Sequence, residues 1–352
     1  MTTGVPMTPT QRALPRWRRF LFALVPLVAL LLLAEVVVRA VRAPLWFDSF
    51  RLLRTDLMAR NYPAERDALL GYVPRPNFES RDNHWGTLVS IDADGMRRNG
   101  GTPPGGEIVA AVGDSFTFGD QVDDDATWPA QLEGALAQPV KNGGVFGYSL
   151  VQSVLRGEAM IERFPISTLI VSFIPDDLVR SEFRHRYTPV PWFDLDGDGL
   201  VLRNVPLDHA AGTNPAKAWK DALGYSALLD AVLAGVAPEW WFGQEKQVSV
   251  PHLVGKGAEI GKRLVERLAA RCRARNVGLL LVLQGPTPDE LALGVLRHAE
   301  AHGVETLDLA TRFAEQNRLD PTLQHRYFAG HMTREGNHWV AEAVASVLRV
   351  RK

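Results

Sequence analysis

The stretch EIVAAVGDSFTFGD, residues 107–120, decides the fold. Residues 107–112 are mostly apolar, partly β-branched and preceded by a Pro/Gly cluster, so they predict a short buried strand. A strand that runs into Gly113, Asp114 and Ser115 places the serine hydroxyl at the carboxyl edge of a sheet, where open α/β sheets bind their ligands. The alternative for Ser115 is a helix-capping serine without chemistry.

From residue 107 onward the chain alternates between strand and helix patterns. Further strands are predicted over 140–142, 168–174, 279–283 and 304–309, and helices over 128–137, 150–164, 258–276, 288–302 and 335–349. Strands interleaved with helices indicate a parallel sheet with helical crossovers. We therefore expect an α/β fold with a doubly wound, flavodoxin-like parallel sheet.

Three blocks of sequence resemble those of the SGNH (GDSL-like) hydrolases and occur in the family's order. They are GDSFTFGD at 113–120, NGGVFGY at 142–148 and HMTREGN at 331–337. In membrane-anchored proteins of this type a Gly-x-Arg element precedes the serine, and GMR at 95–97 is similar to it. The resemblance implies the SGNH hydrolase fold and an enzyme that acts on ester bonds.

The resemblance also implies roles for single residues. Ser115, with Gly113 and Asp114 as its motif, is the expected nucleophile, and His331 is the expected base. The backbone N–H groups of Ser115 and Gly147 are expected to bind the oxyanion.

The base departs from the family pattern. The family has an aspartate three residues before its base, whereas this chain has Phe328. The imidazole then depends on a backbone carbonyl or on an acid from elsewhere, for which Asp308 and Asp320 are candidates. Without an orienting acid the imidazolium is less stabilised, so we expect low activity.

The oxyanion hole departs from the pattern as well, because Asp176 stands where the family places an asparagine. An ionised carboxylate only accepts hydrogen bonds, so Asp176 can join the hole only if its pKa is raised, with Asp177 beside it. Otherwise the hole consists of Ser115 and Gly147 alone, and Asp176 pairs with Arg180 or accepts backbone N–H groups.

No metal and no cofactor are expected. His298 and His302 are one helical turn apart, but no third ligand is evident near them, so we interpret them as a solvated helix face. The run DLDGDG at 194–199 resembles half of a calcium loop without its twelfth-position glutamate, which favours a turn between two strands.

The chain has a single cysteine, Cys272, so it cannot form an intrachain disulfide. Cys272 is expected on a buried helix face.

Residues 20–38 are apolar apart from Glu35 and are long enough to span a bilayer. Several arginines and no acidic residue precede them, which favours a cytoplasmic N-terminus, and Glu35 is expected to pair with Arg39. A cleavable signal peptide is the alternative, but its apolar core would be shorter and no clean cleavage site follows. We therefore expect a single-pass protein of the inner membrane whose catalytic domain lies outside the cytoplasm.

The expected organisation is a basic tail at 1–19, a transmembrane anchor at 20–42, a juxtamembrane segment at 43–66 and an SGNH-like domain at 67–352. Residues 185–250 interrupt the alternation of strands and helices, with a helical run near 216–233, and are interpreted as a lid or substrate wall.

The chain has 39 basic and 40 acidic residues, so it carries no large net charge that would indicate a nucleic-acid partner.

The leading hypothesis is a membrane-anchored serine esterase or O-acyltransferase that acts on ester-linked acyl groups, most simply acetyl, of an envelope or extracellular polysaccharide. Hydrolysis and transfer share an acyl-enzyme, so the sequence leaves both open. The alternative is a non-catalytic glycan-binding accessory protein of a polysaccharide export or modification system. A flavodoxin-type nucleotide binder is disfavoured because Asp114 and Asp120 would repel phosphate.

Overall fold

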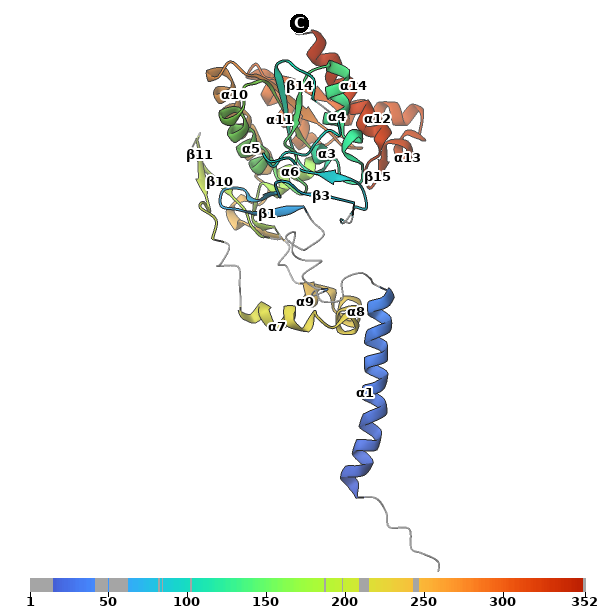
Figure 1. Ribbon diagram of the computed structural model, residues 1–352. Helices are drawn as coiled ribbons and strands as arrows, with labels where there is room; N and C mark the ends of the chain where they lie inside the picture. The colour runs from blue at the N-terminus through green and yellow to red at the C-terminus, as the bar shows by residue number, and fades with distance from the viewer. Residues whose placement is uncertain are drawn as a thin grey trace, which may run out of the picture. The chain divides into compact units, whose positions relative to one another are not determined.

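A computed structural model describes residues 15–41, Phe50, 63–208 apart from 82, 84, 102, 187 and 198, 215–242 and 247–350 (Figure 1). The chain divides into two compact units. The smaller consists of Met1–Arg54 and Pro215–Gly243, and the larger of Thr55–Asn214 and Gln244–Lys352.

Five parallel strands form the centre of the larger unit. They are β5 (Ile108–Val112), β6 (Val140–Asn142), β7 (Ile166–Phe173), β13 (Gly278–Leu283) and β14 (Glu305–Asp308). Their order across the sheet is β14-β13-β7-β5-β6. Numbered along the chain this is 2-1-3-4-5, the flavodoxin-like order, so the predicted fold class is confirmed.

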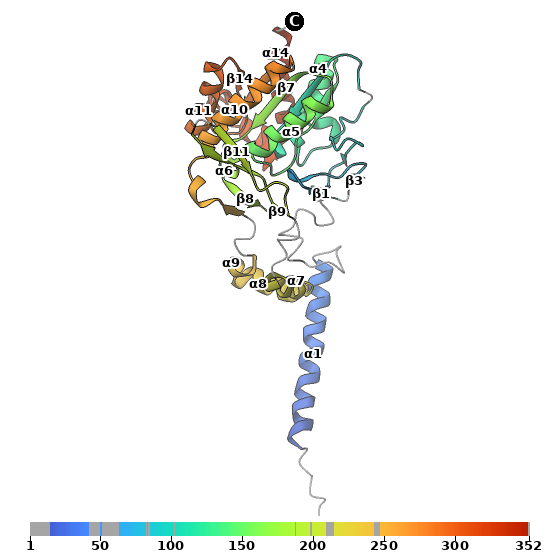
Figure 2. The same cartoon turned by 90° about the vertical axis from the view of Figure 1, so that its left-hand side faces the viewer.

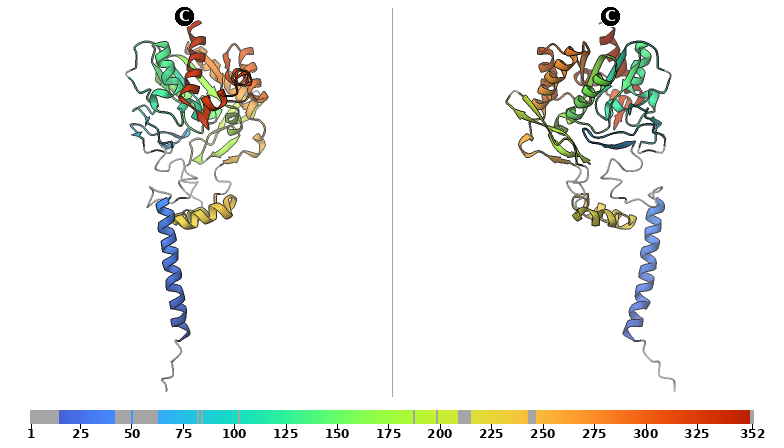
Figure 3. Two further views of the ribbon diagram at one scale, coloured as in Figure 1. Left: turned by 90° about the vertical axis from the view of Figure 1, so that its right-hand side faces the viewer. Right: turned by 60° about the vertical axis from the view of Figure 1, so that its left-hand side comes forward.

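Helices cover both faces of this sheet, as Figure 2 shows from the side of α5 and α10. The first face carries α5 (Leu150–Arg163), α10 (Gly257–Ala274) and α11 (Glu290–Ala301), and the second carries α4 (Trp128–Leu136), α14 (Arg334–Val350) and the start of α12 (Leu309–Leu319). Ala110 and Val112 of β5 pack with the first group, and Val109 and Ala111 with the second, because successive strand residues point to opposite faces. In Figure 3 the C-terminal helix α14, in red, lies beside α4, in green, and the two are packed together.

Cys272 lies on the buried face of α10, as expected. Its side chain is 1% exposed, and Ile260, Leu264 and Leu268 of the same helix are buried with it.

Short antiparallel pairs precede β5. β1 (Ala64–Asp67) pairs with β2 (Gly71–Pro74), and β3 (Glu79–Ser80) pairs with β4 (Val89–Ser90). The other short elements of the larger unit include α3 (Ser115–Phe118), η1 (Asp124–Ala126), α6 (Pro175–Arg180), η3 (Pro251–Leu253), α13 (Leu323–Tyr327), β15 (Phe328–Ala329) and β16 (His331–Met332).

The segment interpreted as one insertion, residues 185–250, is divided between the two units. In the larger unit β8 (Phe183–Arg186) pairs with β9 (Thr188–Pro189) and β12 (Gln247–Ser249). An antiparallel hairpin of β10 (Trp192–Asp196) and β11 (Gly199–Arg203) confirms that the acidic run 194–199 joins two strands.

The middle of that segment belongs to the smaller unit as α7 (Pro215–Leu223), α8 (Ala227–Val236) and α9 (Pro238–Phe242). The single helical run expected near 216–233 is therefore two helices. The chain leaves the first helix at Gly224, and Ser226 caps the second by accepting the N–H of Leu229 at 3.1 Å.

The N-terminal helix of the smaller unit is α1 (Arg16–Val41). Within it, Leu24–Val41 has a mean hydropathy of 2.4 and is long and apolar enough to cross a membrane, a test that a signal sequence also passes. Residues 1–14 of the predicted tail, and residues 43–49 and 51–62 of the predicted juxtamembrane segment, lie outside the described residues.

Candidate active site

Ser115 is the first residue of α3 and follows β5 at the carboxyl edge of the sheet. β5 lies at the switch point of the strand order, between β6 and β7, where doubly wound sheets bind ligands. The residue that caps α3 is Asp114, whose carboxylate accepts the N–H of Phe116 at 2.9 Å. Ser115 is therefore not the capping residue, and its hydroxyl is available for other contacts.

Glycine is needed at two places around this turn. A Cβ on Gly113 would lie 2.5 Å from the carbonyl oxygen of Ser172 on β7. A Cβ on Gly144, in the loop after β6, would lie 2.3 Å from the backbone nitrogen of Phe118. Both separations are shorter than van der Waals contact, so α3 can sit against β7 and the 143–149 loop only with glycine at these positions.

His331 reaches Ser115 from the other end of the chain. It begins β16 after a turn in which Gly330 has a φ of 87°, and its backbone N–H donates to Gln121 Oε1 at 3.2 Å. His331 Nε2 lies 2.9 Å from Ser115 Oγ, a hydrogen-bond distance. Burial lowers the pKa of His331 below its ordinary value of 6.5, so the imidazole is neutral at neutral pH and can accept a proton.

The remaining ring nitrogen of His331, Nδ1, has no hydrogen-bond partner among the described residues. Phe328, at the family's acid position, packs instead in an aromatic cluster: its ring centroid is 4.9 Å from that of Phe313 and 6.4 Å from that of Phe116. The Phe116 ring is in turn 5.5 Å from the imidazole. The ring of the base is thus positioned by aromatic packing and by the backbone of its hairpin.

The two acids suggested from the sequence contact their own segments instead. Asp308 caps α12 by accepting the N–H of Thr311 at 2.9 Å. Asp320 accepts the N–H and the hydroxyl of Thr322, at 3.1 and 2.6 Å. Neither carboxylate contacts His331 in the part of the chain that the structure describes.

Asp120 is an acid that the sequence reasoning did not assign to the site. Its Oδ2 lies 3.7 Å from His331 Nε2, on the serine side of the ring, and the residue is 6% exposed. Burial, and then the nearby Asp114 carboxylate, raise the pKa of Asp120 well above its ordinary value, which favours the neutral form of this carboxyl group. The sequence contained a signal for placing Asp120 near Ser115, because Asp120 is the last residue of the same GDSFTFGD block.

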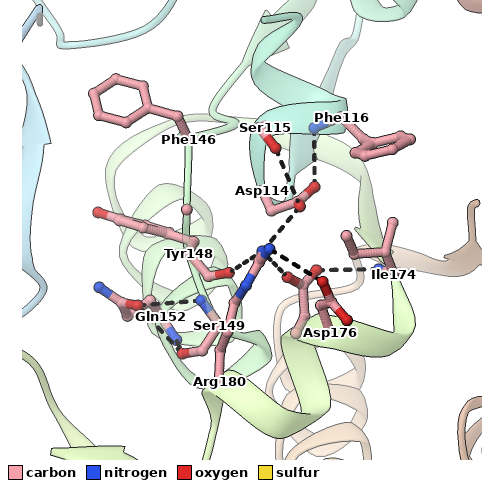
Figure 4. A network of polar contacts seen from close by, with 12 residues as sticks. Asp114, Ser115, Phe116, Phe146, Tyr148, Ser149, Gln152, Ile174, Asp176 and Arg180 are labelled. Atoms are coloured by element: carbon pink, nitrogen blue, oxygen red, sulfur yellow. Dashed lines mark hydrogen bonds and ion pairs between the residues drawn. The ribbon is translucent and has the colours of Figure 1, made fainter. Parts of the chain in front are cut away.

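Arg180 of α6 is the second residue that the sequence reasoning did not assign. Figure 4 shows its guanidinium pointing between α3 and α6 towards Asp114. Its Nη1 lies 3.1 Å from Asp114 Oδ2 and 2.6 Å from Asp177 Oδ1, and it donates to the carbonyl oxygen of Tyr148 at 3.2 Å. One cation thus joins the turn before Ser115, the loop that contains Gly147 and the start of α6.

Asp177, not Asp176, is the buried acid of α6. Asp177 is fully buried, accepts the N–H of Ile174 at 3.1 Å, and has a pKa raised well above the ordinary value by burial and by the Asp114 carboxylate. The side chain of Asp176 is 76% exposed, and its carboxylate lies 3.7 Å from Arg180 Nη2. Of the alternatives for Asp176, the structure therefore contains the pairing with Arg180.

The two expected oxyanion donors are both backbone N–H groups. Within the described chain, neither the N–H of Ser115 nor that of Gly147 has a protein acceptor. Gly147 has a φ of 73°, and its carbonyl oxygen accepts Arg186 Nη1 at 2.6 Å, which fixes this peptide of the loop. Both N–H groups are thus available to an oxygen atom of a ligand.

The arginine of the Gly-x-Arg element before β5 binds the helix that begins with Ser115. Arg97 is 2% exposed and pairs with Asp124 at 3.0 Å. Its Nη1 donates to the carbonyl oxygens of Phe118 and Gly119, at 2.8 and 2.6 Å, which are the last carbonyls of the serine helix. A buried arginine therefore caps the carboxyl end of α3, where the helix dipole favours a cation.

The interpretation of His298 and His302 as a helix face without a carboxylate partner was wrong. Glu266 of α10 lies with them, and candidate ligand atoms of the three residues are within 4.8 Å of one another. His298 Nε2 is 2.7 Å from Glu266 Oε1, and Arg263 Nη1 is 3.6 Å from the same oxygen. Because α11 ends here, just before β14 begins, the cluster is at the opposite edge of the sheet from Ser115.

Comparison with protein-family models and with curated proteins finds no match. Solved structures similar to the chain include a catalytic mutant of Axe2, an acetylxylan esterase from Geobacillus stearothermophilus, at 17% identity and a TM-score of 0.37 over 69% of this chain and 94% of that one. A GDSL-like lipase from Bacteroides thetaiotaomicron has 10% identity and a TM-score of 0.35 over 70% and 88% of the two chains. The acetyl xylan esterase Est2A from the rumen bacterium Butyrivibrio proteoclasticus has 11% identity and a TM-score of 0.37 over 73% and 66%. Because identities and TM-scores are low, we infer the chemistry from the site itself.

Proposed function

We propose that this chain is a serine esterase or O-acyltransferase with Ser115 as nucleophile and His331 as base. The observation that supports this most is the 2.9 Å contact between Ser115 Oγ and His331 Nε2, which joins a strand–turn serine to a neutral imidazole across 216 residues of sequence. A hydroxyl is a weak nucleophile until an adjacent base removes its proton, and this pair supplies both groups.

The proposed reaction has two halves. Ser115 Oγ attacks the carbonyl carbon of an ester while its proton passes to His331 Nε2, and the imidazolium then protonates the leaving alcohol. The acyl group remains on Ser115 as an ester. A water molecule or a carbohydrate hydroxyl, deprotonated by the same imidazole, next attacks this acyl-enzyme and releases Ser115.

The oxyanion of each tetrahedral intermediate would be bound by the N–H groups of Ser115 and Gly147. Neither N–H has a protein acceptor among the described residues, which supports this role, because donors prearranged for a developing charge do not have to reorganise during the reaction. Asp176 takes no part in this proposal, since its carboxylate is exposed and lies beside Arg180.

A hydroxyl-rich acceptor or substrate fits the surface next to the base. A hollow of about 480 Å³ borders the His331 hairpin through Ala329 and Met332. Polar side chains of the hollow are those of Arg81, Thr87, Gln121, Asp123, Thr333 and Arg334. Carbohydrate hydroxyls both donate and accept hydrogen bonds, and such a mixed lining offers partners for both, which supports an O-acylated polysaccharide as the substrate class.

We place the enzyme in the inner membrane through α1, with the larger unit outside the cytoplasm. The 18-residue apolar stretch and the arginines before it support membrane insertion with the N-terminus in the cytoplasm. Contacts of Glu35 with α8 also support it, because cleavage after α1 would remove them from the mature protein.

The test is an ester assay on the purified full chain in detergent. We expect release of p-nitrophenol from p-nitrophenyl acetate and release of acetate from an acetylated oligosaccharide, both lost in Ser115→Ala. Ser153→Ala is the matched control, because Ser153 is also buried and its hydroxyl has no partner among the described residues. Addition of an unacetylated oligosaccharide separates the two reactions, since an acyltransferase would produce an acetylated sugar and an esterase only acetate.

The second candidate is a glycan-binding protein without catalysis. The observation that favours it is the absence of an acid on His331 Nδ1 in the described chain, because a base without that partner is a weaker catalyst. Oligosaccharide binding by a chain that releases no acetate from any ester would support this candidate and contradict the enzyme.

A further inference from the structure

Glu35 is an acidic residue inside the apolar stretch of α1, and its carboxylate binds the start of another helix. It accepts hydrogen bonds from the hydroxyl of Ser226 at 2.8 Å and from the backbone N–H groups of Ala227 and Leu228 at 2.8 and 2.9 Å. Arg39, one turn further along α1, donates to the same carboxylate at 2.6 Å. These are the N–H groups that a helix leaves unsatisfied in its first turn, so α1 supplies the N-terminal partner of α8.

This contact fixes the depth of α8 relative to α1. Val38, the last apolar residue before Arg39, is three residues beyond Glu35, which corresponds to about 4.5 Å along a helix. If α1 crosses a bilayer, Glu35 therefore lies about 4.5 Å inside the end of its apolar stretch. The first turn of α8 must lie at the same level, near the boundary between acyl chains and head groups.

The helices α7, α8 and α9 present the side chains expected at that level. On α8, Val232 and Val236 are one turn apart and are 49% and 74% exposed. Asp230, the acidic residue of α8, is buried and accepts the indole N–H of Trp241 at 2.7 Å. The exposed surface of α8 is therefore apolar.

Large aromatic side chains of α7, of α9 and of the residue pair before α8 are also exposed. Trp219 of α7, Tyr225 before α8 and Trp240 of α9 are 46%, 51% and 49% exposed. Lys220 Nζ lies 4.6 Å from the centroid of the Trp240 ring and donates to the carbonyl oxygen of the same residue at 2.7 Å. Tryptophan, tyrosine and lysine gather at the head-group level of membranes because each combines an apolar body with a polar end.

We propose that residues 215–242 form an in-plane membrane element whose occupant is the lipid of the bilayer that α1 crosses. The apolar face of α8 and the exposed tryptophans of α7 and α9 lie in the head-group and acyl boundary, and Glu35 holds the start of α8 at that depth. Continuity favours lipid over a protein partner, since α8 is hydrogen-bonded directly to α1, whose apolar side chains are exposed along the stretch that could span a bilayer. The inference rests on the membrane placement under the proposed function and is independent of the serine chemistry.

The test places a bimane fluorophore at single positions of the full chain in vesicles of phosphatidylcholine and phosphatidylglycerol at 3:1. The labelled variants are Val232→Cys and Val236→Cys. The one native cysteine, Cys272, is 1% exposed and burial raises the pKa of its thiol to about 11, so background labelling is slow. Leu32→Cys in α1 marks the lipid environment, and Leu319→Cys on α12, where the native side chain is 83% exposed, marks water.

We expect brominated lipid to quench the labels at 232 and 236 at least threefold more than the label at 319, and aqueous iodide to quench them at least threefold less. One result would overturn the in-plane element and leave the anchor intact. In it, lipid quenches the label at position 32, whereas the labels at 232 and 236 show the same lipid and iodide quenching as the label at 319. Protection of 232 and 236 from both quenchers would overturn it in favour of a protein contact, such as a second copy of the chain. Failure of lipid to quench at 32 would overturn the anchor and the in-plane element together.

A second variant tests the part played by Glu35. Glu35→Leu removes the acceptor for three donors of α8 and leaves α1 apolar. We expect lipid quenching at 236 to fall at least twofold while quenching at 32 is unchanged. Unchanged quenching at both positions would contradict the role of Glu35 in setting the depth of α8.

Discussion

The two sides of the candidate active site are built differently. On the serine side, Asp114 is fully buried, caps α3 and contacts Arg180, while Arg97 binds the last carbonyls of the same helix. On the histidine side, His331 stands on a two-strand hairpin with its side chain 30% exposed, and its Nδ1 has no partner among the described residues. The nucleophile is part of the buried polar framework, whereas the base depends on a turn, on Gln121 and on the Phe116 ring.

This difference indicates which part of the site tolerates change. The position of Ser115 depends on groups that also hold the sheet edge together, so substitutions there should affect folding and activity at once. The position of His331 depends on fewer contacts, so substitutions near it should affect activity more than folding. Each prediction below tests one side against the other.

The largest effect is expected for the base. His331→Ala should lower kcat on ester substrates by on the order of 10³-fold or more, because among the described residues no other imidazole lies within hydrogen-bond reach of Ser115 Oγ. Steady-state kinetics on p-nitrophenyl acetate measure this. His338→Ala is the control: His338 contacts Gln131 Oε1 at 2.9 Å and should retain most of the activity. A reversed result for the two histidines would remove His331 from the mechanism.

Arg180→Met should lower the free energy of unfolding by about 3–5 kcal/mol, since it leaves the buried carboxyl groups of Asp114 and Asp177 without their shared cation. Denaturant unfolding of the full chain in detergent measures the change. Arg203→Met is a matched control: Arg203 is half exposed and pairs with Asp194 at 2.9 Å, so it should cost less than about 1 kcal/mol. Equal costs would show that the serine side is not specially dependent on Arg180.

Asp120→Asn tests whether the buried acid beside the base is a hidden triad acid. Because the raised pKa of Asp120 favours its neutral form, which an amide resembles, kcat/KM near neutral pH should fall by no more than about tenfold. A loss near 10⁴-fold, which is the size expected for removal of an orienting acid, would instead assign that role to Asp120.

The pH profile sharpens the same question. His331 must be neutral to accept a proton, and burial lowers its pKa below the ordinary value of 6.5, so activity should be present near pH 7 and lost only as the pH falls through this lowered pKa. This acid limb should persist in Asp120→Asn. An acid limb above pH 7 in the wild-type chain would mean that an unseen carboxylate stabilises the imidazolium.

The smallest effect is expected at Asp176. Its carboxylate is exposed and lies at the Arg180 end of α6, so Asp176→Asn should change kcat/KM by less than about twofold and leave the pH profile unshifted. A gain in rate with a flattened alkaline limb would return this residue to the oxyanion hole, where the family resemblance places an asparagine.

The sequence predicted the fold and indicated Ser115 and His331 as a candidate pair, because both inferences depend on local signals. Apolar runs such as 279–283 and amphipathic runs such as 258–276 specify strands and helices on their own, and their alternation indicates a parallel sheet. The GDSFTFGD block and the His331 turn are likewise local. Their approach to 2.9 Å follows from the carboxyl ends of parallel strands meeting at one edge.

The remaining features depend on contacts that no local pattern contains. Arg180 lies in a short helix that resembles a surface turn, and its pairing with Asp114 spans 66 residues. Glu266 joins His298 only because α10 and α11 pack together. The division of residues 185–250 between two units depends in part on Glu35, which lies 191 residues before its partner Ser226.

The most direct test of the account is covalent capture of the nucleophile. The full chain in detergent is treated with a fluorophosphonate, and the adduct is located by intact mass and peptide mass spectrometry. We predict one adduct on Ser115, absent from Ser115→Ala, retained in Ser153→Ala and slowed by at least about 10²-fold in His331→Ala. An adduct on another residue, or an unmodified wild-type chain that still binds oligosaccharide, would contradict a serine hydrolase built on Ser115 and His331.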